Sequence, residues 1–369
     1  MTAAFENLVV PRFEHALVPT EPVWVFGTGS FGRTLAKALA TNSFEVKGFI
    51  QTRPTSLVVE GLPVREWSEL SKNDYEMPLL IGIFNREAPF DELVGLAKGA
   101  GFEKILLPWD FYAPLSIELG WRYWLADPGF LSYHVDDLSR TYHRLADNES
   151  RSCFERLIQF RAGSDLAYSS FRHKDSQYFN GITLPYLEGM SSRAGGLRYL
   201  DGGAYDGDTY RELLGLSKVQ SAYLFEPDST NFQKLVGSVA SHNFRGLCLP
   251  LALADRHKIS RFSGGLGEAG CIDDVGEDAI TAVSIDEFLA GVPVDFIKLD
   301  LEGGEVDALK GAAYTLANHL PVLAISCYHN PQDLWVLPDL IAGLAPGYKL
   351  YLRQHMHNSF DLVLYAIPT

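Results

Sequence analysis

Acidic and glycine residues alternate in the stretch LDGGAYDGDT at positions 200–209. Asp201 is followed by Gly203 and Gly207, and the three aspartates of the stretch would repel a bound phosphate. A cofactor that carries a cationic amine and a sulfonium is instead attracted by carboxylates, and Gly203 would let it lie against the backbone. A turn in which Asp208 or Thr209 caps the following helix explains the same residues without a ligand.

Two further carboxylates follow the next apolar runs. SAYLFEP ends on Glu226, 19 residues after Gly207, where a carboxylate can accept hydrogen bonds from both hydroxyl groups of an adenosine ribose. LCLPLALAD ends on Asp255, which we predict to meet the adenine amino group. Alternatively, Glu226 simply ends a strand before proline, and Asp255 belongs to a solvated turn. Together these residues predict a site for S-adenosylmethionine.

A third group of residues could serve methyl transfer to a hydroxyl, which requires an aligned acceptor and a group that takes its proton. Asp300 lies in VDFIKLDLEGGE, with Lys298 and Glu302 beside it, and His329 ends the run AISCYH. We predict that His329 accepts the proton or orients the acceptor, because a neutral imidazole suits proton transfer near pH 7. A hydrogen-bonded histidine at a strand end is an equal alternative. No spacing of ligands indicates a required metal.

The elements that position these residues alternate between strands and helices. The last two expected strands are separated by HMHNSF and should pair as an antiparallel hairpin, whereas helices join the earlier ones, which should be parallel. Such a seven-stranded sheet is typical of S-adenosylmethionine-dependent methyltransferases. The expected strands are 197–201, 221–226, 247–254, 294–300, 321–328, 348–354 and 361–367.

An earlier glycine-rich turn, GTGSFG at 27–32, follows the apolar run VWVF and precedes a helical pattern. This is the G-x-G-x-x-G order of a dinucleotide site. About 20 residues later, where an NAD site presents an acid, the sequence has Gln51, Thr52 and Arg53. Arg53 could accept a phosphate, so NADP or a sugar nucleotide remains an option, and a nucleotide-sugar oxidoreductase or epimerase that uses this domain is the alternative function. A Rossmann-like fold kept for acceptor docking or assembly is the simpler interpretation.

These patterns predict an α/β protein with three parts. Residues 1–115 should form a small Rossmann-like domain, residues 116–195 a helical connector, and residues 196–369 the methyltransferase domain. In the connector, apolar and aromatic residues recur at helical spacing, with no alternation typical of strands.

Four ordered stretches, LDGGAYDGDT, YLFEPD, FIKLDLEGGEVDALKGA and VLAISCYHNPQDLW, resemble the successive motifs of the FkbM family of methyltransferases. The resemblance covers about residues 197–369, and LADNESRSCFERLIQFRAG is similar to the helical lead-in of longer members. It implies an S-adenosylmethionine-dependent O-methyltransferase, with a small-molecule or glycan acceptor such as a polysaccharide precursor or secondary metabolite. Gly202 and Gly304 depart slightly from the commonest family pattern.

Composition restricts the partners. The net charge of −15 comes from 31 Lys and Arg against 46 Asp and Glu, which disfavours nucleic acid and anionic membranes. The N-terminal residues do not resemble a signal peptide, and nowhere do 18 apolar residues run together. We expect a cytoplasmic protein without membrane insertion, and leave open whether it forms a homo-oligomer.

Overall fold

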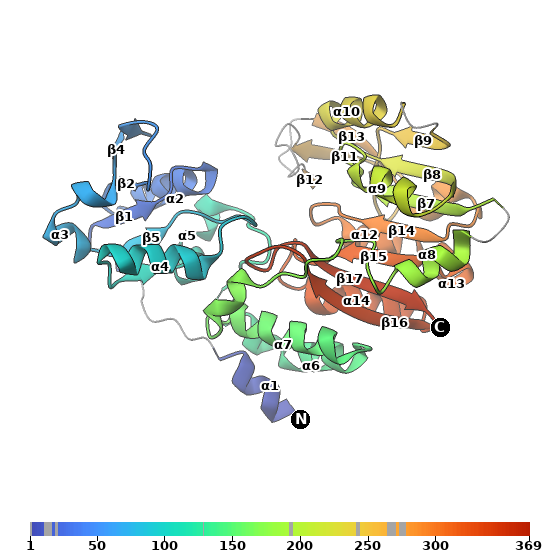
Figure 1. Ribbon diagram of the computed structural model, residues 1–369, viewed down its shortest axis with the longest axis horizontal. Helices are drawn as coiled ribbons and strands as arrows, with labels where there is room; N and C mark the ends of the chain where they lie inside the picture. The colour runs from blue at the N-terminus through green and yellow to red at the C-terminus, as the bar shows by residue number, and fades with distance from the viewer. Residues whose placement is uncertain are drawn as a thin grey trace. The chain divides into compact units, whose positions relative to one another are not determined.

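The computed structural model describes residues 2–10, 17–18, 21–127, 129–191, 195–240, 244–263, 271–272 and 278–369. The chain forms two compact units (Figure 1). The first unit comprises residues 1–139, 152–173 and 356–360, and the second comprises residues 140–151, 174–355 and 361–369. The helices of the expected connector are thus divided between the two units.

The first unit contains a six-stranded sheet in the order β3-β4-β2-β1-β5-β6. Strand β1 pairs in parallel with both β2 and β5, which is the doubly wound arrangement that the alternating sequence predicts. The strands are β1 (Val23–Phe26), β2 (Val46–Ile50), β3 (Val58–Val59), β4 (Leu62–Arg65), β5 (Leu79–Ile81) and β6 (Ile105–Leu106).

Helices of the first unit pack their apolar sides on this sheet. Leu35 and Leu39, four residues apart on one face of α2, join a core with Val23 and Val25 of β1. The helices in or shared by this unit are α1 (Thr2–Leu8), α2 (Ser30–Thr41), α3 (Lys72–Tyr75), α4 (Phe90–Ala100), α5 (Pro108–Leu119), α6 (Val135–Arg144) and α7 (Asn148–Arg161).

The short segment 356–360 belongs to the first unit although it lies near the C-terminus of the chain. Its Asn358 is fully buried and donates hydrogen bonds to the carbonyls of Asn85 and Ala88, at 2.8 and 2.7 Å. The same side chain accepts the backbone N–H of Phe90 at 3.0 Å. Asn358 therefore fixes the chain just before α4.

The second unit contains a seven-stranded sheet in the order β16-β17-β15-β14-β7-β8-β9. Strand β17 runs antiparallel to both β15 and β16, and the other strands share one direction. The predicted sheet, with its antiparallel C-terminal hairpin, is confirmed; Figure 1 shows this hairpin in red. The strands are β7 (Leu197–Gly202), β8 (Val219–Phe225), β9 (Gly246–Leu249), β14 (Phe296–Leu299), β15 (Val322–Ser326), β16 (Tyr348–Gln354) and β17 (Leu362–Pro368).

Alternation along these strands builds the core of the second unit. Every second residue of β17, namely Val363, Tyr365 and Ile367, joins one cluster, because successive side chains of a strand point to opposite faces. Leu213 of α9 and Leu235 of α10 cover the same face. The helices are α8 (Leu184–Ser191), α9 (Asp208–Leu216), α10 (Ser229–Val239), α11 (Ile285–Leu289), α12 (Glu305–Lys310), α13 (Ala313–His319) and α14 (Asp333–Leu344).

The strand expected at 247–254 is broken in the structure. Strand β9 ends at Leu249, directly before Pro250, and a separate strand β10 (Ala252–Leu253) follows. Proline cannot donate to a strand ladder, so the break has a local cause. Strand β10 joins a second, four-stranded sheet with β11 (Lys258–Ser263), β12 (Cys271–Ile272) and β13 (Asp278–Val283), in the order β10-β13-β11-β12. This sheet was not predicted from the sequence.

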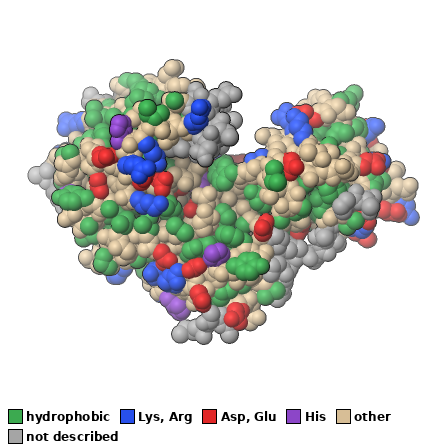
Figure 2. All heavy atoms as spheres, turned by 180° about the vertical axis from the view of Figure 1, so that it is seen from behind, with side chains coloured by type: hydrophobic (Ala, Val, Ile, Leu, Met, Phe, Trp, Pro, Cys, Tyr) green, Lys and Arg blue, Asp and Glu red, His purple; other side chains and the backbone are tan. Residues whose placement is uncertain are grey.

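The surface mixes charges of both signs. On the face shown in Figure 2, Lys and Arg side chains are interspersed with Asp and Glu. In the described ranges, every helix is too short or too polar to cross a membrane. Among the described cysteines, Cys153, Cys248 and Cys327 form no disulfide bond.

Candidate active site

The turn after β7 depends on two glycines with left-handed backbone. Gly203 has a φ of +76°, and a Cβ atom there would lie 1.9 Å from the carbonyl oxygen of Asp300. Gly207 has a φ of +81°, and its Cβ would meet Leu235 at 2.9 Å. Both positions therefore require glycine for the packing of the turn itself. The direct ligand contacts predicted for them remain predictions.

Asp201, on strand β7 just before this turn, is linked to the turn through Lys298. Its side chain has no exposed surface, and Oδ1 lies 3.1 Å from Nζ of Lys298. The hydroxyl of Tyr199 donates to Oδ2 at 2.9 Å. Lys298 in turn donates to the carbonyls of Gly202 and Gly203, at 3.3 and 2.6 Å. Asp201 thus acts on the glycine turn through Lys298, which is a positioning role.

The ion pair of Asp201 and Lys298 is almost completely buried, and burial raises the pKa of Asp201 above its ordinary value although Lys298 opposes this shift. Burial alone would lower the pKa of Lys298, but the carboxylates of Asp201 and Asp300 raise it above its ordinary value. A buried ammonium without such partners would lose its proton. From the sequence Lys298 was known only as a neighbour of Asp300, although its place one residue before the end of the central strand β14 was a usable signal.

Glu226 follows β8 directly and joins the two loops at the adjacent strand ends. One carboxylate oxygen accepts the backbone N–H of Tyr205 at 2.9 Å, and the other accepts that of Asp228, also at 2.9 Å. The side chain is largely buried, and burial raises the pKa of Glu226 to about 7. Each carboxylate oxygen has a second lone pair that can accept a ligand hydroxyl.

Asp255 follows β10 and lies outside the seven-stranded sheet. Its carboxylate pairs with Lys258 at 2.9 Å and with Arg256 at 3.6 Å. Because Pro250 ends β9 five residues earlier, the residue at the tip of the third strand is not Asp255. Asp255 therefore does not follow a strand of the seven-stranded sheet, and its contact with the adenine amino group stays a prediction.

Asp300 and His329 do come together, at the ends of the neighbouring strands β14 and β15. Nε2 of His329 lies 3.5 Å from Oδ1 of Asp300, and Nδ1 lies 2.8 Å from Oε1 of Glu305. The imidazole is completely buried, whereas 26% of the Asp300 side chain is exposed. Of this pair, Asp300 is the one that a ligand can reach.

The charge on His329 differs from the sequence-based expectation. Burial opposes a charged ring, but the carboxylates of Glu305, Glu302 and Asp300 outweigh it and raise the pKa of His329 to about 10. At neutral pH the ring is therefore an imidazolium, which has no lone pair for another proton. The role of a neutral base does not fit this surrounding, and His329 is better suited to hold Asp300 in place.

Two further residues, Tyr178 and Asp333, interact with the side chains around Asp300 and His329, and the sequence did not indicate these interactions. The hydroxyl of Tyr178 donates to Oδ2 of Asp300 at 2.9 Å, although it precedes Asp300 by 122 positions. Asp333 accepts the backbone N–H of Asn330, and burial together with Glu305 raises the pKa of Asp333 to about 7. Lys298 and His329 outweigh burial at Asp300 and lower its pKa, so this carboxyl is ionised.

Asp300, Glu305 and His329 also offer ligand atoms that lie within 4.8 Å of one another. By distance alone this group could hold a metal ion. A hydrogen bond of 2.8 Å between Nδ1 of His329 and Oε1 of Glu305 engages one atom of each of these two residues without a metal. The sequence-based expectation that no metal is required therefore stays a prediction.

Three comparisons with known proteins bear on this site. Residues 201–357 match the model of the methyltransferase FkbM domain. The crystal structure of methyltransferase FkbM from Methylobacillus flagellatus KT aligns with a TM-score of 0.75 and 21% identity, over 99% of this chain and 98% of that chain. The precorrin-6y C5,15-methyltransferase of Geobacter metallireducens GS-15 reaches a TM-score of 0.32 and 13% identity, over 51% and 86%. No curated protein matches the chain.

Proposed function

We propose that the protein is an S-adenosylmethionine-dependent O-methyltransferase, because residues 201–357 match the model of the methyltransferase FkbM domain. Its acceptor is a sugar hydroxyl of a glycan, a polysaccharide precursor or a secondary metabolite. The observation that carries the proposal is the position of Glu226, whose carboxylate lies at the tip of β8 and is bonded to the glycine turn through Tyr205.

The residues present fit the cofactor. Glu226 is held by two backbone N–H groups, so its remaining lone pairs have fixed directions for the two ribose hydroxyls. Strands β8, β7 and β14 are adjacent, so Glu226, the glycine turn and Asp300 follow strand ends at one edge of the sheet. Asp300, Glu302 and Glu305 give this edge an excess of carboxylates, which favours a cationic ligand. When bound, S-adenosylmethionine supplies an activated methyl group.

Asp300 is the group that we assign to the acceptor hydroxyl. It is ionised and partly exposed, and it receives hydrogen-bonding support from Tyr178 on one oxygen and from charged His329 near the other. A carboxylate held in this way can accept the hydrogen bond of the hydroxyl and take its proton as the oxygen is methylated. The sugar class of the acceptor rests on the family resemblance.

Titration calorimetry of the full chain tests the cofactor. We expect S-adenosylmethionine to bind, and Glu226→Gln to weaken the affinity by roughly 10- to 100-fold, as for loss of charge-assisted hydrogen bonds. Glu103→Gln, at an exposed position of the first unit, is the matched control. Absence of binding to the unchanged protein, or equal binding by Glu226→Gln, would contradict the proposal.

A second experiment addresses the acceptor. The full chain is incubated with methyl-labelled S-adenosylmethionine and a panel of neutral sugars, polysaccharides, phenols and amines, and labelled products are separated by mass. We expect label on a sugar hydroxyl. Label on an amine or phenol alone would retain the methyltransferase assignment and reject the sugar acceptor.

A further inference from the structure

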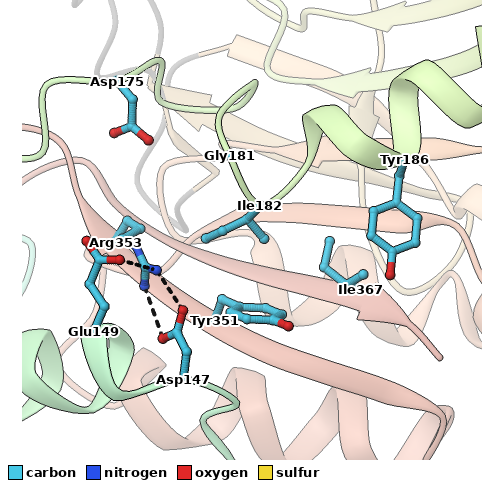
Figure 3. Close-up of a pocket in the computed structure, with 9 residues that line it drawn as sticks. All are labelled: Asp147, Glu149, Asp175, Gly181, Ile182, Tyr186, Tyr351, Arg353 and Ile367. Carbon is cyan, nitrogen blue, oxygen red and sulfur yellow. Dashed lines mark hydrogen bonds and ion pairs between the residues drawn. The ribbon is translucent and has the colours of Figure 1, made fainter.

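A pocket of about 380 Å³ lies within the second unit, apart from the residues assigned above. Its size is in the range of small-molecule sites. Asp147 and Glu149 line it from the segment that begins α7, Tyr186 from α8, and Tyr351 and Arg353 from β16, as Figure 3 shows. With the loop that carries Asp175 and strand β17, which contributes Ile367, five elements or loops converge on it.

The charge of this pocket is negative even though it contains an arginine. Nη2 of Arg353 lies 2.7 Å from Oδ2 of Asp147 and 2.8 Å from Oε2 of Glu149, and only 6% of the Arg353 side chain is exposed. The guanidinium is thus already bonded to two carboxylates. With Asp175, three carboxylates face one guanidinium, so phosphate groups and other anionic ligands are disfavoured.

Asp175 is the carboxylate that stays most available. Its side chain is 48% exposed, and Nδ1 of His355 lies 3.9 Å away, which is beyond hydrogen-bond distance. In Figure 3 it lies at the opposite side of the pocket from Tyr186. A ligand in the pocket can therefore bind Asp175 without displacing an existing partner of comparable strength.

Aromatic and aliphatic side chains supply the rest of the lining. The rings of Tyr351 and Tyr186 lie beside Ile182 and Ile367, on the side of the pocket away from Asp175. Tyrosine rings attract organic cations through their π faces, and the attraction adds to that of a nearby carboxylate. Rings without carboxylates would suit any apolar group, and carboxylates without rings would suit small metal ions. The combination of rings and carboxylates instead favours a cation that carries carbon substituents.

We propose that this pocket is a binding site for an organic ammonium cation, with Asp175 pairing with the charged nitrogen and Tyr351 contacting its carbon substituents. The inference goes beyond the proposed function, because binding here requires neither the methyl donor nor methyl transfer. It also differs from the edge of the sheet that bears Asp300, since no residue is shared between the two sites.

Ligand-observed NMR by saturation transfer tests this proposal on the full chain. The probes are spermidine, cadaverine and tetramethylammonium as cations, maltose as a neutral polyol, and inorganic phosphate followed by phosphorus NMR. We expect signals from at least one cation, weakening as salt is raised, and none from maltose or phosphate.

Two substitutions locate the binding. Tyr351→Ala should weaken the affinity of the best cation by roughly 2- to 30-fold, and Asp175→Asn by about 2- to 5-fold. Tyr133→Ala and Asp136→Asn, at exposed positions of the first unit, are the matched controls and should leave the affinity unchanged. Circular dichroism and S-adenosylmethionine titration show whether each variant is folded, and Asp175→Asn tests the site even if Tyr351→Ala unfolds.

Several results would overturn the proposal. These are no binding of any cation, cation binding that both pocket variants retain in full, or binding of maltose or phosphate that Tyr351→Ala removes. The last result would reassign the pocket to a neutral or anionic ligand.

Discussion

The chain contains two glycine-rich turns in equivalent places, one in each unit, and they differ in what surrounds them. Both follow a central parallel strand and precede a helix, α2 in the first unit and α9 in the second. In the first turn, a Cβ atom on Gly32 would lie 2.2 Å from the carbonyl of Gly27, whereas one on Gly29 would meet nothing within 4 Å. The first turn is thus tightly packed against its helix but open at its centre.

The second turn is bound by side chains from neighbouring strands. Lys298 of β14 holds its carbonyls, and Glu226 after β8 accepts its Tyr205 N–H. At the corresponding tip of β2 the first unit has Gln51, whose backbone pairs with Arg65. A glycine turn on its own therefore specifies a strand-to-helix bend, and charged residues from adjacent strand ends give it a ligand preference.

The largest expected effect concerns the buried ion pair beneath the second turn. Lys298→Met should lower the free energy of unfolding by about 3–5 kcal/mol, because it leaves Asp201 as an uncompensated buried charge. Urea unfolding followed by circular dichroism measures the loss. The double variant Asp201→Asn/Lys298→Met should recover part of it; a single Lys298→Met variant as stable as the unchanged protein would show that the pair does not anchor the turn.

Substitution at the reacting end of the site should affect the rate far more than cofactor binding. We expect Asp300→Asn to reduce kcat by about 10²- to 10⁴-fold, the usual contribution of a general base, with a much smaller loss of affinity for S-adenosylmethionine. Rates of label transfer to the acceptor, with calorimetry alongside, separate the two quantities. A full rate would remove Asp300 from the chemistry.

The paired glycines allow a direct test of the comparison. Gly203→Ala should destabilise the second unit by about 1–3 kcal/mol or more, because the new Cβ would lie against the Asp300 carbonyl in left-handed backbone. Gly29→Ala should leave stability unchanged, since its Cβ points into open space. Thermal unfolding of both variants measures the two stability changes. Equal losses of stability would mean that the two turns are packed alike.

A smaller, pH-dependent effect is expected from His329. Its folded-state pKa of about 10 lies above the ordinary value of 6.5, so its stabilisation is complete below about pH 6.5 and is lost as pH rises toward 10. The slope is at most about 1.4 kcal/mol per pH unit. His329→Gln should flatten the decline of unfolding free energy between pH 7 and 9, whereas the exposed control His143→Gln should keep it. An unchanged slope in His329→Gln would place the titrating group elsewhere.

The smallest expected effect is that of metal removal. If the hydrogen bond between His329 and Glu305 holds these side chains in place without a metal ion, dialysis against EDTA should leave the rate of methyl transfer within about twofold of its original value. Loss of activity that Mg²⁺, Mn²⁺ or Zn²⁺ restores would show that Asp300, Glu305 and His329 hold a metal.

Sequence patterns predicted the fold because strand periodicity and turn residues are local signals. The buried run at 296–299 and the hairpin around HMHNSF could be assigned without knowledge of their partners. The break at Pro250 was also visible in the sequence, but the apolar residues on both sides of the proline suggested one strand. Residues 252–253 instead join a separate sheet, and this choice depends on pairing with β13, which lies far along the chain.

The site was predictable only in part, since chemistry depends on contacts between distant segments. Asp300 and His329 could be brought together because both follow adjacent parallel strands. The charge on His329 could not be foreseen, because it depends on Glu305 bonding Nδ1 and on burial of the ring. Asp201 follows the same logic: its residue type indicated a ligand contact, whereas its burial against Lys298 is a property of the folded sheet.

Segments of the two units alternate along the chain, and this alternation limits how such a protein can change over generations. A piece that began at residue 196 would lack residues 140–151 and 174–195 of the second unit, including Tyr178, and would carry Asn358 without its partners Asn85 and Ala88. One recombination crossover between genes therefore cannot exchange one unit for a foreign counterpart. We expect the two units to be inherited together and to diverge as a single heritable block.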